Sequence, residues 1–135
     1  MYKLKILTIF CFIFLFMLVG TATAGNVTLA WDPVQASDLA GYRIYYDTDM
    51  SGEPYNGTGA VQGPSAVEIP LSSLVDVTNP EFTLEGLDTS KTYYFVATAY
   101  DDLNLESKYS NEVRADFPPG VPQNLTITIT ITITQ

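Results

Sequence analysis

Thr92-Tyr-Tyr-Phe-Val-Ala-Thr-Ala-Tyr100 is the stretch that decides the fold class. Six of the eight residues from position 93 to position 100 are β-branched or aromatic, which are the side chains that strands prefer. Successive side chains of a strand point to opposite faces, so alternate positions of this stretch share a face. The stretch therefore predicts a long strand with large side chains on both of its faces.

Shorter segments of the same kind lie on both sides of this stretch. They predict strands over 27–31, 42–46, 66–69, 82–86 and 109–117, with a long loop over 47–64 and one irregular helical turn over 71–77. No part of the chain after residue 24 keeps a helical period. Several short strands separated by turn residues predict an all-β sandwich or a small barrel.

The first 24 residues have the pattern of a signal peptide. Lys3 and Lys5 precede an apolar run over 6–19, and the small residues Ala22-Thr23-Ala24 follow it. A run of this length is shorter than the roughly 20 residues that span a bilayer. We expect export to the periplasm or the extracellular space, with cleavage after Ala24. Retention as a membrane anchor is the alternative.

The charge balance excludes nucleic acid as a partner. The chain has 6 basic and 15 acidic residues, and the loss of Lys3 and Lys5 would leave 4 basic residues and a net charge of −11. Contacts to phosphate need lysine and arginine, so nucleic acid and anionic lipid would be repelled. After cleavage we expect no stable membrane insertion.

The end of the chain has its own pattern. Residues 118–123 contain three prolines and predict a stiff linker after a domain over 25–117. Residues 124–135 alternate threonine with isoleucine and predict a strand-forming tail.

Several motifs together resemble a fibronectin type III domain of the kind found in exported bacterial proteins. Val27-Thr-Leu-Ala-Trp31 is similar to strand B of that family, Gly41-Tyr-Arg-Ile-Tyr-Tyr46 to strand C, and the stretch from Leu87 to Tyr93 to its tyrosine corner. The resemblance covers 27–117 and implies an immunoglobulin-like β-sandwich. It implies a core that includes Trp31, Tyr42, Ile44, Tyr46, Leu87, Tyr93, Phe95, Ala97 and Val113. Strand A of the family is missing before residue 27.

Residue types argue against catalysis. The chain has no histidine, and its one cysteine, Cys11, lies in the leading segment, so the usual nucleophilic triads and zinc sites cannot form. We expect no catalytic residue, no cofactor and no metal. Calcium at the oxygen ligands of one loop stays open; these are Asp101, Asp102, Asn104 and Glu106.

Strand parity and the strand order of the family place a set of side chains together on the outer face of strands C and F. The set is Tyr45, Tyr94, Val96 and Tyr100. Aromatic outer faces anchor proteins or stack on sugars, and they also simply stabilise sheets. We therefore expect a non-catalytic module for protein binding, adhesion or spacing. The alternative is a carbohydrate-binding accessory domain of a secreted or cell-surface system.

The missing strand A and the tail suggest three hypotheses for residues 124–135. They are the first strand of a second repeat, a disordered end, or a strand that fills the open sheet edge of another molecule. To enter its own edge in the usual direction, the tail would first have to return roughly 30 Å along the domain, or about nine extended residues. The linker has six, so we expect exchange between molecules to be easier than pairing within one.

Overall fold

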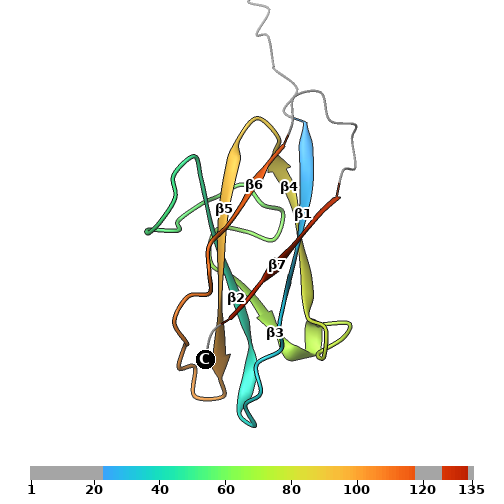
Figure 1. The fold of residues 1–135 in the computed structure, drawn as a ribbon, viewed down its shortest axis with the longest axis vertical. Helices are drawn as coiled ribbons and strands as arrows, with labels where there is room; N and C mark the ends of the chain where they lie inside the picture. The colour runs from blue at the N-terminus through green and yellow to red at the C-terminus, as the bar shows by residue number, and fades with distance from the viewer. Residues whose placement is uncertain (1–22, 118–125, 134–135) are drawn as a thin grey trace, which may run out of the picture.

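The structure is a computed structural model that describes residues 23–117 and 126–133, and within them it is a sandwich of two β-sheets (Figure 1). This confirms the predicted all-β class. The leading segment up to residue 22 and the linker lie outside the described residues. The strands are β1 (Ala24–Trp31), β2 (Leu39–Thr48), β3 (Val67–Pro70), β4 (Glu81–Asp88), β5 (Thr92–Asp101), β6 (Val113–Asp116) and β7 (Thr126–Ile131).

The larger sheet has the order β3-β2-β5-β6, and all of its pairings are antiparallel. Its centre is the long pairing of β2 with β5, in which Tyr46 lies opposite Phe95 and Tyr45 opposite Val96. Because side chains alternate along each strand, Tyr46 and Phe95 enter the core while Tyr45 and Val96 lie on the outer face. The outer face of this sheet carries the candidate site.

The smaller sheet has the order β4-β1-β7. β1 pairs with β4 in antiparallel fashion, with a register shift between Gly25 and Val27. β2 and β5, the strands that resemble strands C and F, are neighbours as the resemblance implies, and β7 lies at the edge beside β1.

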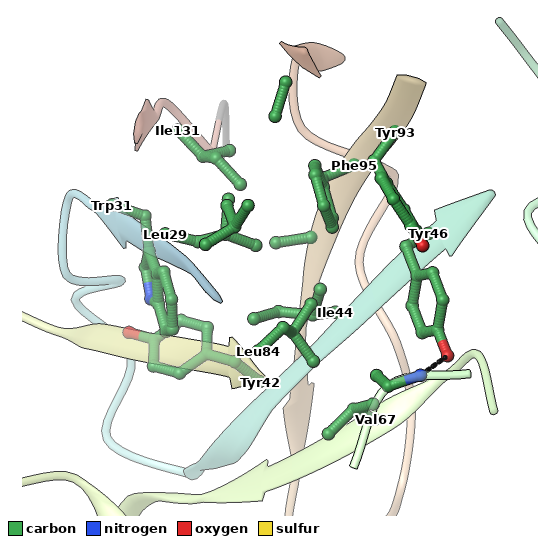
Figure 2. Packing of buried hydrophobic residues seen from close by; sticks show 14 of the residues in the cluster. Leu29, Trp31, Tyr42, Ile44, Tyr46, Val67, Leu84, Tyr93, Phe95 and Ile131 are labelled. Atoms are coloured by element: carbon green, nitrogen blue, oxygen red, sulfur yellow. Dashed lines mark hydrogen bonds between the residues drawn. The ribbon is translucent and has the colours of Figure 1, made fainter. Parts of the chain in front are cut away.

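Large aromatic and aliphatic side chains from both sheets fill the space between them (Figure 2). Tyr42, Ile44 and Phe95 have no exposed surface, and the ring of Trp31 meets the ring of Tyr42 edge to face at 5.1 Å. Val113 is half-buried and packs against this core. Hydroxyl groups at the edge of the core find partners, as where Tyr46 donates to the carbonyl of Gly63.

The segment before β6 differs from the strand predicted over 109–117. β6 begins only at Val113, and two serines replace the regular pairing before it. The hydroxyl oxygens of Ser107 and Ser110 accept hydrogen bonds from the backbone nitrogens of Ala99 and Ala97 on β5. The predicted helical turn over 71–77 is likewise shorter, a single 3-10 turn over Leu71–Ser73.

Residues 126–131 of the tail form β7, which pairs with β1 of the same chain in parallel fashion. This direction differs from the one that strand A of the family takes. Leu29 pairs with Ile129, and Trp31 pairs with Ile131, which is completely buried. The expectation that the tail could not easily reach its own sheet was wrong, because it assumed that the tail would run in the direction of strand A. The start of β1 and the end of β6 lie at the same end of the sandwich, where a side chain on Gly25 would collide with Phe117. From there the chain needs no return path to run alongside β1 (Figure 1).

Candidate functional site

A groove of about 440 Å³ crosses the outer face of the larger sheet. Its floor comes from β2 and β5, and its walls come from the loop after β2 and from the segment between β5 and β6. The residues that line it are Tyr45, Glu53, Thr98, Glu106, Ser107, Lys108 and Tyr109. The groove therefore combines two tyrosines, two carboxylates and one lysine.

Glu106 is the fixed centre of this groove. Its carboxylate accepts hydrogen bonds from the hydroxyls of Tyr45 and Thr98 and from the guanidinium of Arg43, and 27% of its side-chain surface is exposed. Burial alone would raise the pKa of Glu106, but these three donors together hold it below the ordinary value. Glu106 is therefore a stable anion near neutral pH.

Arg43 of β2 forms ion pairs with carboxylates on β3 and on the loop after β5. Its guanidinium binds the carboxylates of Glu68 and Glu106 at 3.1 Å and 2.9 Å and the side-chain oxygen of Asn104. It also lies 4.4 Å from the centre of the Tyr100 ring, the geometry of a cation–π contact. One side chain thus links β2, β3, β5 and the loop that follows β5.

These contacts bear on the open question of calcium. Asn104 and Glu106 direct their oxygens at Arg43, and Asp101 uses one carboxylate oxygen to accept the backbone N–H groups of Leu103 and Leu105. Within residues 23–117 and 126–133, no group of three acidic, histidine or cysteine side chains is arranged to hold a metal ion. Arg43 offsets the charge of Glu106, one of the three carboxylates of this loop.

Three tyrosine rings pack together at the groove: Tyr45 and Tyr109, which line it, and Tyr55, which does not. Tyr109 meets Tyr45 at 5.1 Å and Tyr55 at 5.5 Å between ring centres, both edge to face. The hydroxyl of Tyr55 donates to Glu112, which also accepts from Ser51 and the backbone nitrogen of Gly52. Burial raises the pKa of Tyr45 and Tyr55, and the carboxylates that they bind raise it further. Both tyrosines stay protonated, and Tyr109, at 38% exposure, is the ring open to a partner.

The four side chains predicted on the outer face have different surroundings. Tyr45 lies in the groove and is half-buried. Tyr94 is also half-buried but lies opposite Asp47 and Arg114, away from the groove lining. Val96 and Tyr100 are only 1% and 8% exposed, so they offer little surface to a partner. The face is covered because the segment after β5 folds back over it and bonds to Thr98 and Tyr45 through Glu106.

Sequence reasoning missed Glu53, Lys108 and Tyr109 as groove residues. Glu53 belongs to a segment predicted only as a long loop, and that segment is fastened across the sheet by the bonds of Ser51, Gly52 and Tyr55 to Glu112. The sequence predicts a strand over 109–117, but Tyr109 lies before β6, in the segment that folds back over the sheet. No local pattern in the sequence indicates these long-range contacts.

A second hollow has charged and polar side chains but no exposed aromatic ring. It has a volume of about 410 Å³ and lies beside the loop that carries Gly57 and Gly59, with Lys91 and Asp88 at its rim. Its aromatic residue, Tyr93, is only 2% exposed. We therefore take the groove around Tyr109 as the candidate site.

Comparison with known proteins gives a distant similarity. The chain is 27% identical over 117 residues to the receptor-type tyrosine-protein phosphatase F of Bos taurus, and 27% identical over 118 residues to the human protein of that name. The alignments cover 82% and 83% of this chain but only 5% of each phosphatase. No family model matches the chain. The similarity therefore concerns one domain-sized stretch of a far larger protein.

Proposed function

We propose that this chain is an exported, non-catalytic fibronectin type III-like module that binds a protein partner through the groove around Tyr109. The observation that carries the proposal is one exposed aromatic ring, Tyr109, in a groove that is also lined by charged groups of both signs, Glu53 and Lys108. Exposed aromatic residues anchor many protein interfaces, because they bury a large area at small entropic cost. Charges around such an anchor select the partner and its orientation.

The chemistry of the groove supports a role without catalysis. Two carboxylates in one cleft could in principle hydrolyse a glycoside, but one of them must then act as an acid with a raised pKa. In Glu106 the pKa is lowered, and the three donors on its oxygens leave it no role as a proton donor. The similarity to receptor phosphatases covers 5% of their length, so their named activity is not carried over.

Cleavage of the expected signal peptide would leave most of β1 in place. The expected cleavage point follows Ala24, which is the first residue of β1, and the pairing with β4 continues from Gly25 onwards. Cleavage would therefore remove one strand residue and leave the sheet intact. No helix within the described ranges 23–117 and 126–133 is long and apolar enough to cross a membrane. Intact-mass measurement of the exported protein should show a chain that begins at Gly25; a mass that includes Lys3 and Lys5 would mean a retained anchor.

The site is tested by a matched pair of tyrosine variants. Binding of the chain to a panel of extracellular and cell-surface proteins should fall at least about tenfold in Tyr109→Ala, the loss of about 1.4 kcal/mol expected for an interface anchor. Tyr94→Ala removes a ring from the same outer face outside the groove, so it should leave binding unchanged. Equal effects of the two variants would contradict the assignment of the site to the groove.

A carbohydrate ligand is the second candidate, because an exposed tyrosine beside two carboxylates also suits a sugar ring and its hydroxyls. A glycan array separates the two candidates. Sugar binding that is lost in Tyr109→Ala and kept in Tyr94→Ala would favour a carbohydrate-binding accessory domain. Protein binding with no signal on the array would favour the first candidate.

A further inference from the structure

The two sheets end in four edge strands, and three of these are protected against pairing with another chain. β3 has four residues, includes Glu68 and ends in Pro70. β6 also has four residues, and Arg114 and Asp116 form a salt bridge along it at 2.9 Å. Short length, charge and proline are the usual means by which natural sheets protect their edges.

The third protected edge is β4, which has loop residues against its outer side. The backbone nitrogen of Val61 donates to the carbonyl of Glu85, and the backbone nitrogen of Glu85 donates to the side chain of Gln62, each at 2.9 Å. Gly86 has a φ of 74° and interrupts the regular strand next to this point. β4 also carries Glu81, Glu85 and Asp88.

β7 has none of these protections. It forms the end of its sheet, and within the described ranges no strand pairs with its outer side. β6 comes close to β7, and just beyond the strand the backbone nitrogen of Thr132 donates to Asn111. Its sequence, Thr-Ile-Thr-Ile-Thr-Ile, contains no charge, proline or glycine. Ile127 and Ile129 pack against the core but are only partly buried, so a neighbouring strand would cover more of them.

The distribution of charge allows a second copy of the chain to pair with β7. The chain carries a net charge of −9, so two copies repel each other over most of their surfaces. The last charged residue is Asp116, and no charge follows from 117 to 135. Two copies can therefore approach closely along β7 without placing acidic groups against each other.

We propose that β7 is a self-association edge, along which two copies pair their β7 strands in antiparallel fashion. An antiparallel pair of identical alternating strands can place threonine beside threonine on one face and isoleucine beside isoleucine on the other, and both are favourable cross-strand pairs. The contact is the same from both copies, so it closes as a symmetric dimer with one continuous six-stranded sheet. The other edges of that sheet are the two protected β4 strands.

Sedimentation of the chain as recovered from the cells that make it tests this proposal. We expect a monomer–dimer equilibrium that tightens as salt is raised, because salt screens the repulsion between the two acidic copies. Thr128→Glu places a new charge on the exposed face at the centre of β7 and should weaken dimerisation at least about tenfold. Thr58→Glu adds the same charge to an exposed loop residue and should leave dimerisation unchanged. A chain that is monomeric at every concentration, or an equal effect of the two variants, would overturn the proposal.

A second variant separates edge pairing from the exchange of β7 between molecules, and it does not depend on how Thr128→Glu folds. In a Cys11→Ser background, a disulfide between Ala30→Cys and Thr130→Cys would fasten β7 to its own β1, since these positions are paired. Edge pairing predicts that the oxidised protein still dimerises. Disulfides that join two chains, or loss of the dimer on oxidation, would show that the copies exchange β7 and would contradict edge pairing. The groove lies on the other sheet, so neither result bears on the proposed binding site.

Discussion

Trp31, the last residue of β1, lies in register beside Ile131, the last residue of β7, and both side chains are buried. The tail of the chain is thus part of the core as well as part of the sheet. Ile131→Ala should lower the free energy of unfolding by about 2–5 kcal/mol, the usual cost of truncating a buried isoleucine. Thr130→Ala, at an exposed position of the same strand, should change it by less than about 0.5 kcal/mol. Urea unfolding curves that show equal small changes would place β7 outside the core.

Truncation of the tryptophan itself should be costly. Trp31 is 3% exposed and packs edge to face on Tyr42. Trp31→Ala should therefore cost about 3–5 kcal/mol of unfolding free energy. Because the indole nitrogen has no hydrogen-bond partner within the described part of the chain, Trp31→Phe removes no bond and should cost less than Trp31→Ala. A loss below about 1 kcal/mol in Trp31→Ala would mean that β1 is wrongly placed.

The hydroxyl of Tyr93 ties the start of β5 to the end of β4. It lies 2.9 Å from the backbone nitrogen of Asp88 and accepts its hydrogen bond, while the ring is 2% exposed. Tyr93→Phe keeps the ring and removes the acceptor, so it should cost about 1–3 kcal/mol. Tyr94→Phe on the next, half-buried residue is the matched control and should be nearly neutral. Similar losses in both variants would contradict the special role of Tyr93.

Glu106 in the groove should make the free energy of unfolding depend on pH in the acidic range. The pKa of Glu106 in the folded protein is held below its ordinary value of 4.5, so its contribution to stability is complete above that value and is lost as pH falls through the folded pKa. Glu106→Gln removes this contribution. The variant should be less stable than the wild type at neutral pH, and the gap should close below pH 4.5. A gap of constant size from neutral to acidic pH would show that the charge of Glu106 does not matter.

The core was predictable from the sequence to a larger extent than the site. Alternation along Tyr42, Ile44 and Tyr46 identifies the buried face of β2, because a one-residue slip would expose all three side chains. The same parity places Val96 on the outer face, where it does lie, but parity does not show what covers that face. The cover comes from Glu106 and Tyr109, which reach Thr98 and Tyr45 only after the chain has folded back.

The direction of β7 could not be read from its pattern either. An alternating strand fits a sheet edge in parallel or antiparallel fashion, and the side-chain pattern is the same in both. The parallel pairing follows from where the chain arrives, since Phe117 lies beside Gly25 at the start of β1. That neighbourhood depends on the whole sandwich and leaves no local signal in residues 124–135.

The parallel placement of β7 against β1 is tested most directly by two double-cysteine variants in a Cys11→Ser background. Ala30 and Thr130 are partners in the parallel register, whereas an antiparallel strand centred on the pair of Thr28 and Thr128 would bring Thr126 to Ala30. Mild oxidation of Ala30→Cys/Thr130→Cys should give a disulfide within one chain, seen by intact mass and on a non-reducing gel. Ala30→Cys/Thr126→Cys should stay reduced under the same conditions. A disulfide in the second variant and none in the first would contradict the parallel strand.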